Sequence, residues 1–288
     1  MSFAVHHAKS VDDALALAAR YRETGRFLAG GTDLIIQMQR GRIEPEHLID
    51  LSPIASLHGI REEEDGFVIG ALTTHKDIER YPGFRGALHG LVEAARVVGG
   101  HQIRNVGTIG GNVVNASPAA DLVPVLLALN AEAVLLGAAG ERRMPLAQFL
   151  TGPGLTRRRA EELLISIRLP RLPPGSATAF LKAGRRKAME ISVVCVAARL
   201  TLQDRRISTA ALALGAVGPT GLRAGAAERF LEGRTAEPAV LAEAGRLAAD
   251  AAMPVGDVRA SAEHRRQIVP ALIERALERC LERIEAAL

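Results

Sequence analysis

The sequence predicts an α+β protein that is divided into two domains. The chain has 288 residues, which is enough for two domains of ordinary size. Helical periodicities alternate with short apolar runs until Pro170 closes a strand-like segment. The stretch "RLPPGS" at 171–176 reads as a linker, and after it three strand-like segments precede two helices. We therefore expect one domain at 1–172 and a second at 173–288, both of α+β type.

Helices and strands are expected to alternate in the first domain. Ser10 stands before two acidic residues and an apolar repeat of helical spacing, which predicts a capped helix over 10–21. A short strand in "RFLAGG" breaks at its paired glycines, and the helix that follows in "TDLIIQMQRG" ends at Gly41. The pattern further predicts strands at 47–52 and 66–74, a helix capped by Thr74 and a helix over 86–99.

The longest apolar stretch is "LVPVLLALNAEAVLLGAA" at 122–139. Pro124, Asn130 and Glu132 interrupt it, so we expect a buried helix followed by a strand and no membrane span. Residues 131–149 predict two strands joined by a turn, and 160–170 a further strand. The second domain is expected to contain antiparallel strands in "ATAFLKAG", "EISVVCVAARLTLQ" and "ISTAALALGAVG", then helices over 239–252 and 264–288.

Composition and charge argue against a nucleic-acid partner. Aromatic residues make up only 3% of the chain, which disfavours the stacking platforms of proteins that bind single strands. The formal net charge is only +4, and the basic residues cluster at 157–159, 184–187 and 264–266. Clusters of this size indicate solvated faces more often than a track for a phosphate backbone. We expect no nucleic acid to bind.

The two cysteines indicate the compartment. Cys195 and Cys280 lie far apart in the sequence, and two thiols cannot by themselves hold an iron–sulfur cluster or a structural zinc. They are expected to be inert apolar thiols in a reducing environment. The first residues, "MSFAVHHAKSVDD", lack the apolar core of a signal peptide. These features predict a cytoplasmic protein.

The segment "LAGGTDLII" at 28–36 is the first candidate binding motif. Paired glycines between a strand and a helix permit positive φ angles and a close approach of the backbone to a ligand. The amides of Gly31, Thr32 and Asp33 are then available for an anion. Taken alone, the motif is better explained as a tight turn with Thr32 as the helix cap.

A second segment, "IRNVGTIGGNVVNASPAAD" at 103–121, favours the binding interpretation. It again places paired glycines in a loop, beside Thr108 and Asn112. Further polar residues surround this loop within an apolar region: Arg104, Asn105, Asn115, Ser117 and Asp121. Buried polar groups need partners, and the pyrophosphate and ribose hydroxyls of a dinucleotide supply them. The two loops are therefore expected to form the two walls of one ligand cradle.

Other sequence fingerprints of catalysis are missing. The chain has no GxGxxG opening a strand–helix unit and no GxxxxGK[ST], so neither a Rossmann site nor a P-loop is indicated. It also lacks GxSxG, HExxH and any His-rich cluster, so we expect no catalytic side chain and no metal site. If the protein is an enzyme, a cofactor performs the chemistry.

These segments resemble a known family. "LAGGTDLIIQMQRG", "QIRNVGTIGGNVVNASPAADLVPVLLAL" and "GRRKAMEISVVCVAARL" are similar to the FAD-binding medium subunit of molybdenum hydroxylases. That family includes xanthine dehydrogenases, carbon monoxide dehydrogenases and aromatic hydroxylases, and the resemblance covers essentially the whole chain. It implies an FAD-binding domain at 1–172 of the PCMH and vanillyl-alcohol-oxidase type, with subdomains at about 1–57 and 58–172. It also implies a C-terminal flavoprotein domain at 173–288, with a three-stranded antiparallel sheet and helices.

The resemblance assigns FAD-binding residues in both loops and beyond them. The first loop wraps the FAD diphosphate with backbone amides, and the second holds the same group through the side chains of Thr108 and Asn112. Asp121 matches an acid that binds a ribitol or adenosine hydroxyl. Lys182 matches a position beside the isoalloxazine, although it also reads as an exposed lysine at a strand end. The complete implied set is Leu28, Ala29, Gly30, Gly31, Thr32, Asp33, Leu34, Val98, Thr108, Ile109, Gly110, Gly111, Asn112, Asp121, Leu164 and Lys182.

The resemblance also implies a function and partners. The chain is expected to pass electrons from the 2Fe–2S clusters of a small partner subunit through FAD to a soluble acceptor or a quinone. A large partner subunit is expected to hold the molybdenum cofactor, in a heterotrimer or a dimer of heterotrimers. Two alternatives stay open: a stand-alone FAD-dependent oxidase or dehydrogenase of the same fold, and a non-catalytic nucleotide-binding protein. No cysteine lies between 112 and 170, unlike in the hydroxybenzoyl-CoA reductase branch of the family.

Overall fold

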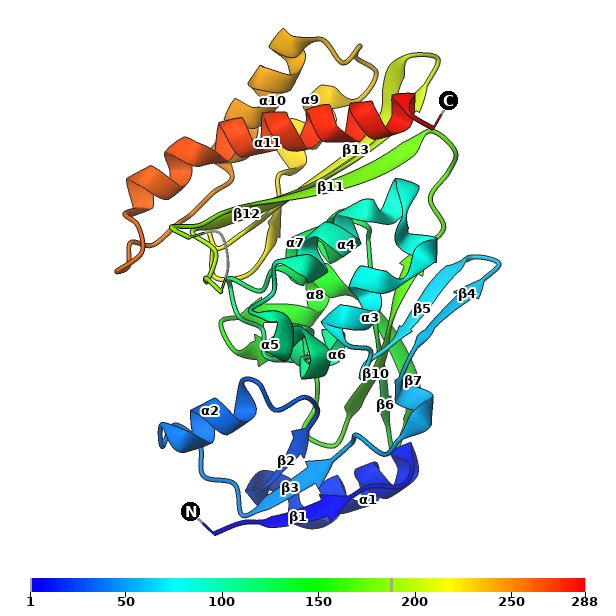
Figure 1. Cartoon of the computed structure of the whole chain (residues 1–288), viewed down its shortest axis with the longest axis vertical. Coiled ribbons are helices and arrows are strands. Elements are labelled where there is room, and N and C mark those ends of the chain that lie inside the picture. The colour runs from blue at the N-terminus through cyan, green and yellow to red at the C-terminus, as the bar shows by residue number, and fades with distance from the viewer. Residues whose placement is uncertain (1, 187–188, 288) are drawn as a thin grey trace.

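The computed structural model describes residues 2–186 and 189–287. Lys187, the last residue of the basic cluster at 184–187, lies outside the described residues. Three sheets follow one another along the long axis of the molecule (Figure 1). An N-terminal sheet lies at one end, a central sheet with helices occupies the middle, and a C-terminal sheet with its helices lies at the other end (Figure 1). The predicted α+β fold in these parts is confirmed.

The N-terminal sheet is small and entirely parallel, with strand order β1-β3-β2. Helices connect its strands, as parallel neighbours require. Ser10 caps the first helix as expected, because its hydroxyl accepts a hydrogen bond from the amide of Asp13 at 3.1 Å. The elements are β1 (Ala4–His7), α1 (Val11–Tyr21), β2 (Gly25–Leu28), α2 (Leu34–Gln39) and β3 (His47–Asp50).

The central sheet is antiparallel and has the order β4-β5-β10-β6-β7. Its strands are β4 (Ile60–Glu63), β5 (Gly66–Gly70), β6 (Glu132–Gly137), β7 (Gly140–Pro145) and β10 (Leu163–Pro170). A two-stranded ribbon of β8 (Leu150–Gly152) and β9 (Leu155–Thr156) lies beside it in the chain. The accompanying helices are α3 (His75–Arg80), α4 (His89–Arg96), α5 (His101–Val106), α6 (Ile109–Val114), α7 (Leu122–Ala128) and α8 (Leu146–Phe149).

The apolar stretch at 122–139 is a buried helix followed by a strand, as the sequence predicts. Every residue of α7 is buried, and β6 begins only a few residues later. These side chains pack into one core with residues of the central sheet, including Ile69 and Ile167. Within the described residues, no helix is long and apolar enough to cross a membrane.

The expectation of a second glycine loop at 107–112 was wrong in its local structure. Gly110 and Gly111 lie in the first turn of α6, and Thr108 caps that turn by accepting a hydrogen bond from the Gly111 amide at 3.0 Å. Glycine is a poor helix former, but here packing decides. A Cβ on Gly110 would lie 2.6 Å from the carbonyl oxygen of Ala71, so only glycine fits.

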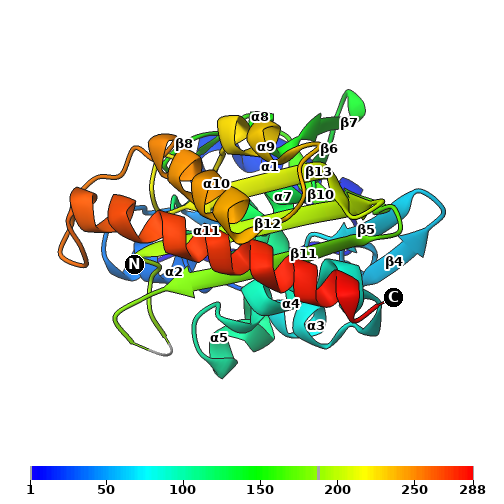
Figure 2. The same ribbon diagram turned by 90° about the horizontal axis from the view of Figure 1, so that it is seen from above.

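The C-terminal sheet is antiparallel in the order β11-β12-β13-β14. The three predicted strands are β11 (Ser176–Ala183), β12 (Val194–Gln203) and β13 (Arg206–Gly215), and β14 (Leu222–Arg223) adds a short edge. The predicted helices α10 (Pro238–Asp250) and α11 (Ala262–Glu285) cover one face of the sheet, with α9 (Gly225–Leu231) preceding them in the chain (Figure 2). The opposite face packs against α4 and α7.

Both cysteines are free and fully buried in these cores, as expected. Burial raises the pKa of the Cys280 thiol to about 12, so this thiol stays protonated and unreactive. The same cause raises the pKa of Cys195.

Candidate functional site

A cavity of about 430 Å³ lies between the N-terminal sheet and the helices of the central part. Residues of both glycine motifs line it, together with Leu163 and Leu164 at the start of β10. The two motifs are about 80 residues apart in the chain, yet Gly30 packs against the backbone of Val106 and Gly107. The sequence-predicted residues that line this cavity are Ala29, Gly30, Gly31, Thr32, Asp33, Leu34, Val98, Thr108, Gly110, Gly111, Asn112 and Leu164.

The first wall offers a row of free hydrogen-bond donors. Among the described residues, the backbone N–H groups of residues 30–34 donate no hydrogen bond. Gly31 has a φ of +69°, a conformation that glycine adopts without strain. Gly30 has no room for a side chain, since a Cβ there would lie 1.8 Å from the carbonyl oxygen of Val106. Consecutive free amides around a tight turn form a concave site for an anion.

The backbone amides of the second wall, at residues 109–112, already donate hydrogen bonds within the protein. The N–H groups of Ile109 and Gly110 donate to the carbonyls of Thr73 and Ala71, at 3.0 and 2.9 Å. The Gly111 and Asn112 amides both donate to Thr108, to its hydroxyl and its carbonyl respectively. The wall therefore contributes side chains, above all Asn112, whose buried Oδ1 atom has no partner within the described part of the chain. Buried polar atoms are normally paired, so this one indicates a missing ligand.

The cavity has a positive charge balance. Arg26, Arg158 and Asp33 are its charged lining residues in the described structure. Burial lowers the pKa of Arg158, and its guanidinium donates to three backbone carbonyls, including that of Glu162 at 2.7 Å. Burial raises the pKa of Asp33. Two cations against one acid favour an anionic ligand.

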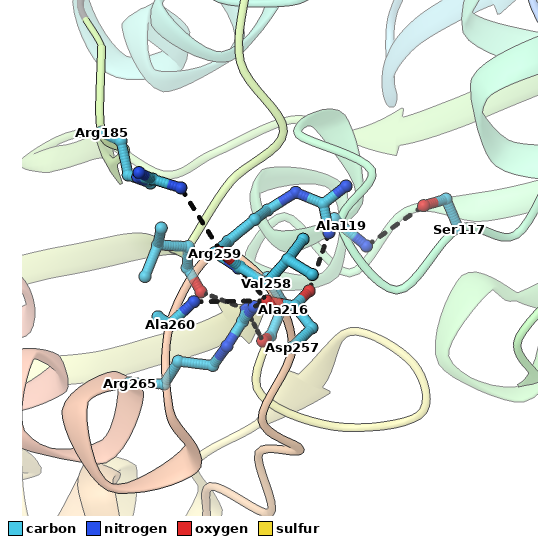
Figure 3. A network of polar contacts seen from close by, with 10 residues as sticks. Ser117, Ala119, Arg185, Ala216, Asp257, Val258, Arg259, Ala260 and Arg265 are labelled. Atoms are coloured by element: carbon cyan, nitrogen blue, oxygen red, sulfur yellow. Dashed lines mark hydrogen bonds and ion pairs between the residues drawn. The ribbon is translucent and has the colours of Figure 1, made fainter.

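The sequence predicted that the basic clusters are solvated faces. For the clusters at 157–159 and 264–266 this is only partly correct, because one arginine of each turns inward. Arg158, the middle residue of 157–159, lines the cavity. Arg265, the middle residue of 264–266, is only 4% exposed and pairs with Asp257 at 2.7 Å (Figure 3). Both arginines turn inward because backbone carbonyls accept their hydrogen bonds.

His75 is a cavity residue that sequence reasoning missed. It begins α3 immediately after the capping residue Thr74, and an isolated bridge pairs Thr74 with Thr108 of the second wall. Burial, and to a lesser degree the charge of Arg104, lowers the pKa of His75 to about 4, so its ring is neutral. Its buried Nδ1 atom lacks a hydrogen-bond partner among the described residues.

Four predicted residues do not line the cavity. Leu28 ends β2, and Ile109 is fully buried in the central core. Asp121 and Lys182 form a buried ion pair of 2.7 Å between the central part and the C-terminal sheet. Lys182 is thus not an exposed lysine at a strand end, which was one of its two sequence interpretations.

The other lining residues that the sequence did not single out come from several elements. Arg26 and Phe27 belong to β2, and Gln37 of α2 donates to Asn115 after α6 at 3.3 Å. A charged residue within a short strand that leads into a glycine turn was a usable signal for Arg26. No local signal existed for Arg158, which approaches Phe27 to within 5.8 Å only in the folded chain.

Comparison with known proteins gives a consistent result over both halves of the chain. Residues 1–172 match the family described as the FAD binding domain in molybdopterin dehydrogenase, and residues 179–280 match the CO dehydrogenase flavoprotein C-terminal domain. The carbon monoxide dehydrogenase medium chain of Hydrogenophaga pseudoflava is 34% identical, with 96% of each chain covered. The nicotinate dehydrogenase FAD-subunit of Eubacterium barkeri is 36% identical, with 78% of each chain covered.

The solved structures agree with this assignment. A chain of the reconstituted CO dehydrogenase from Oligotropha carboxidovorans superposes with a TM-score of 0.94 at 34% identity. The match covers 98% of this chain and 99% of that one. At this coverage the similarity extends over the cavity and both domains.

Proposed function

This chain belongs to the family of FAD-binding subunits of molybdopterin dehydrogenases, and from this premise we propose that it is the electron-transfer subunit of a multi-subunit molybdenum hydroxylase. The observation that carries the proposal is the row of free amides at residues 30–34, which faces a cavity with a positive charge balance. Bound FAD supplies the redox chemistry, because a flavin exchanges both single electrons and electron pairs. The protein supplies the binding and the orientation.

We assign the binding roles as follows. The amides of residues 30–34 donate to the diphosphate, and Arg26 and Arg158 balance its charge. Gly111 leaves space for the ligand, and the unpaired Oδ1 atom of Asn112 accepts a hydrogen bond from a hydroxyl or N–H group of the ligand. Val98 and Leu164 present apolar surface. Asp121 and Lys182 support the site from the junction of the two domains, which we place at 172/173.

The partners follow from the same proposal. A large molybdopterin-binding subunit oxidises the substrate, and a small subunit with 2Fe–2S clusters passes electrons to this chain. This chain then delivers them to a soluble acceptor or a quinone, in a cytoplasmic heterotrimer or a dimer of heterotrimers. The relatives support this arrangement because each is by name a medium chain or an FAD-subunit of a dehydrogenase.

The visible spectrum of the purified chain tests the proposal. We expect flavin absorbance at about one FAD per chain, either as isolated or after reconstitution. A folded chain that is colourless and takes up no FAD would overturn the proposal. Co-expression with candidate large and small subunits then tests the assembly, with size-exclusion chromatography and metal analysis as the measurements.

A further inference from the structure

The segment 157–162, between β9 and β10, carries Arg158 into the wall of the FAD cavity. This segment also fixes the guanidinium, because the Nη1 atom of Arg158 donates to three of its backbone carbonyls, including that of Glu162 at 2.7 Å. Among the described residues, the Nε and Nη2 atoms of Arg158 donate to no group, and neither atom is enclosed by protein. One edge of the guanidinium is therefore free.

The free edge has the shape of an oxyanion site. Arg142 shows the same geometry next to it, because the Nε and Nη2 atoms of Arg142 hold the two carboxylate oxygens of Glu162, at 2.6 and 2.8 Å. Two parallel N–H groups of a guanidinium match two oxygens of a carboxylate or of a phosphate. Within the part of the chain that the structure describes, Arg158 has no carboxylate partner for these two atoms.

The ion pair of Arg142 and Glu162 holds the backbone on both sides of Arg158. Arg142 donates to the carbonyl of Arg157, the preceding residue, at 2.8 Å. Glu162 accepts a hydrogen bond from the amide of Arg159, the following residue, at 2.7 Å. Glu162 is buried, and the hydrogen bonds from Arg142 lower its pKa, so the pair stays ionised near neutral pH. The free edge of Arg158 is therefore ordered before a ligand binds.

The surroundings of Arg158 favour a ligand group with more than one negative charge. Burial lowers the pKa of Arg158, and the charge of Arg26, which lines the same cavity, acts in the same direction. Arginine stays protonated in proteins even so, which leaves two cations close together. A diphosphate offsets their repulsion, whereas a neutral base does not. The guanidinium carbon of Arg158 also lies 5.8 Å from the centre of the Phe27 ring, which supports it from one side.

We propose that Arg158 is a preformed two-point site for one phosphate group of FAD, and that Arg142 and Glu162 are its positioning residues, an inference that rests on the proposed function. The two N–H groups of Arg158 add to the free amides of residues 30–34 on the same diphosphate. A site that is ordered in advance loses little side-chain entropy when the ligand arrives. It should therefore capture the diphosphate without the flavin, so we expect ADP to compete with FAD.

Ligand competition on the full-length, FAD-free chain tests the site, with flavin fluorescence as the measurement. We expect Arg158→Gln to raise the dissociation constant of FAD at least about tenfold and that of ADP by a similar factor, because both ligands lose the same phosphate contact. Adenosine, which has no phosphate, should compete equally with both proteins. Added salt should weaken FAD binding less in Arg158→Gln than in the wild type, because one charge contact is already gone.

The positioning pair has its own test. Glu162→Gln keeps the size of the side chain and removes its charge, so it should weaken FAD and ADP binding but leave the competition by adenosine unchanged. The double variant Arg158→Gln/Glu162→Gln should bind FAD no more weakly than Arg158→Gln alone, because Glu162 acts through Arg158. Arg142→Lys keeps the charge without the two-point contact, and it repeats this test if Glu162→Gln does not fold.

Glu63→Gln is the matched control. It breaks the 3.0 Å ion pair between Glu63 and Arg168 in the same central sheet, and neither residue lines the cavity. It should leave the dissociation constants of FAD and ADP at their wild-type values. Melting temperatures of all variants show which of them are folded.

The possible results separate this inference from the proposed function. Wild-type affinity of folded Arg158→Gln for FAD and ADP would overturn the phosphate site and leave the FAD subunit intact. Failure of ADP to compete in the wild type, or weaker competition by adenosine in Arg158→Gln, would also contradict a phosphate at Arg158. Additive losses in the double variant would overturn the positioning role of Glu162. A wild-type chain that takes up no FAD would instead overturn the proposed function.

Discussion

The Nζ atom of Lys182 lies 2.7 Å from Oδ2 of Asp121, although Lys182 is in β11 and Asp121 immediately precedes α7 in the other domain. Ser192 donates to the second carboxylate oxygen at 2.5 Å. Lys182 is also 3.4 Å from the carbonyl oxygen of Val97, beside the cavity residue Val98. The pair therefore joins the two domains directly behind the cavity wall.

Removing one partner of this pair should be costly. Lys182→Met leaves a buried carboxylate without its counter-ion, and we expect the free energy of unfolding to fall by about 3 kcal/mol. The double variant Asp121→Asn/Lys182→Met should recover most of this loss, because it removes the unpaired charge. Urea unfolding of the FAD-free chain measures both values. Strictly additive losses in the double variant would contradict a direct pairing.

His75 should make stability depend on pH. Its pKa is about 4 in the folded chain and about 6.5 when unfolded, so the unfolded chain binds the proton more readily. Stability is thus complete above about pH 6.5 and decreases as the pH falls towards about 4. Between about pH 7 and about pH 5 the loss should reach about 2 kcal/mol.

The variant His75→Gln isolates this contribution. It does not titrate in that range, so its free energy of unfolding should fall by about 2 kcal/mol less than that of the wild type. Urea unfolding at the two pH values is the measurement. The same decrease in both proteins would show that His75 is not the group responsible.

The glycines of the two walls should respond differently to substitution. A Cβ on Gly111 meets only the Thr108 hydroxyl, at 3.0 Å, so Gly111→Val should fold and lose FAD. Gly31→Val should lose FAD and also about 1–3 kcal/mol of stability, because its φ is +69°. Gly233→Val, at a φ of +79° in the C-terminal domain and with open space around its Cβ, controls for backbone strain alone. Full FAD occupancy in Gly31→Val and Gly111→Val would refute the two-walled cradle.

Arg104 should act on FAD through the cavity wall. It donates to the carbonyls of Val98 and Gly99, at 3.4 and 3.3 Å, and Glu79 holds it at 3.4 Å. We expect Arg104→Gln to raise the FAD dissociation rate about tenfold, which corresponds to about 1.4 kcal/mol. Stopped-flow flavin fluorescence measures the rate.

Arg96→Gln is the control for Arg104. Arg96 approaches the same Glu79 at 3.9 Å but is 75% exposed. Arg96→Gln should leave the FAD dissociation rate unchanged. Arg104→Lys should raise this rate less than Arg104→Gln does, because lysine keeps the positive charge. Equal FAD dissociation rates in Arg104→Gln and Arg96→Gln would show that Arg104 does not position the cavity wall for FAD.

Sequence reasoning succeeded where the cause of structure is local. Ser10 and Thr74 cap helices through atoms three residues away, so their role is readable in the sequence. The turn at Gly30 and Gly31 is equally local, and both glycines line the cavity. The glycines of α6 were interpreted as a loop because glycine disfavours helices. Only the close contact of Gly110 with Ala71 in the folded chain explains why a glycine stands in this helix.

The sequence by itself determined the α+β fold, the two glycine motifs and the family, because periodicity, caps and turns depend on neighbouring residues. The tertiary structure decided which distant groups meet. It brought His75 and Arg158 to the cavity, and paired Asp121 with Lys182 across the domain junction. Such contacts depend on how the sheets and helices pack, and side-chain burial and charge at the site emerge only from that packing.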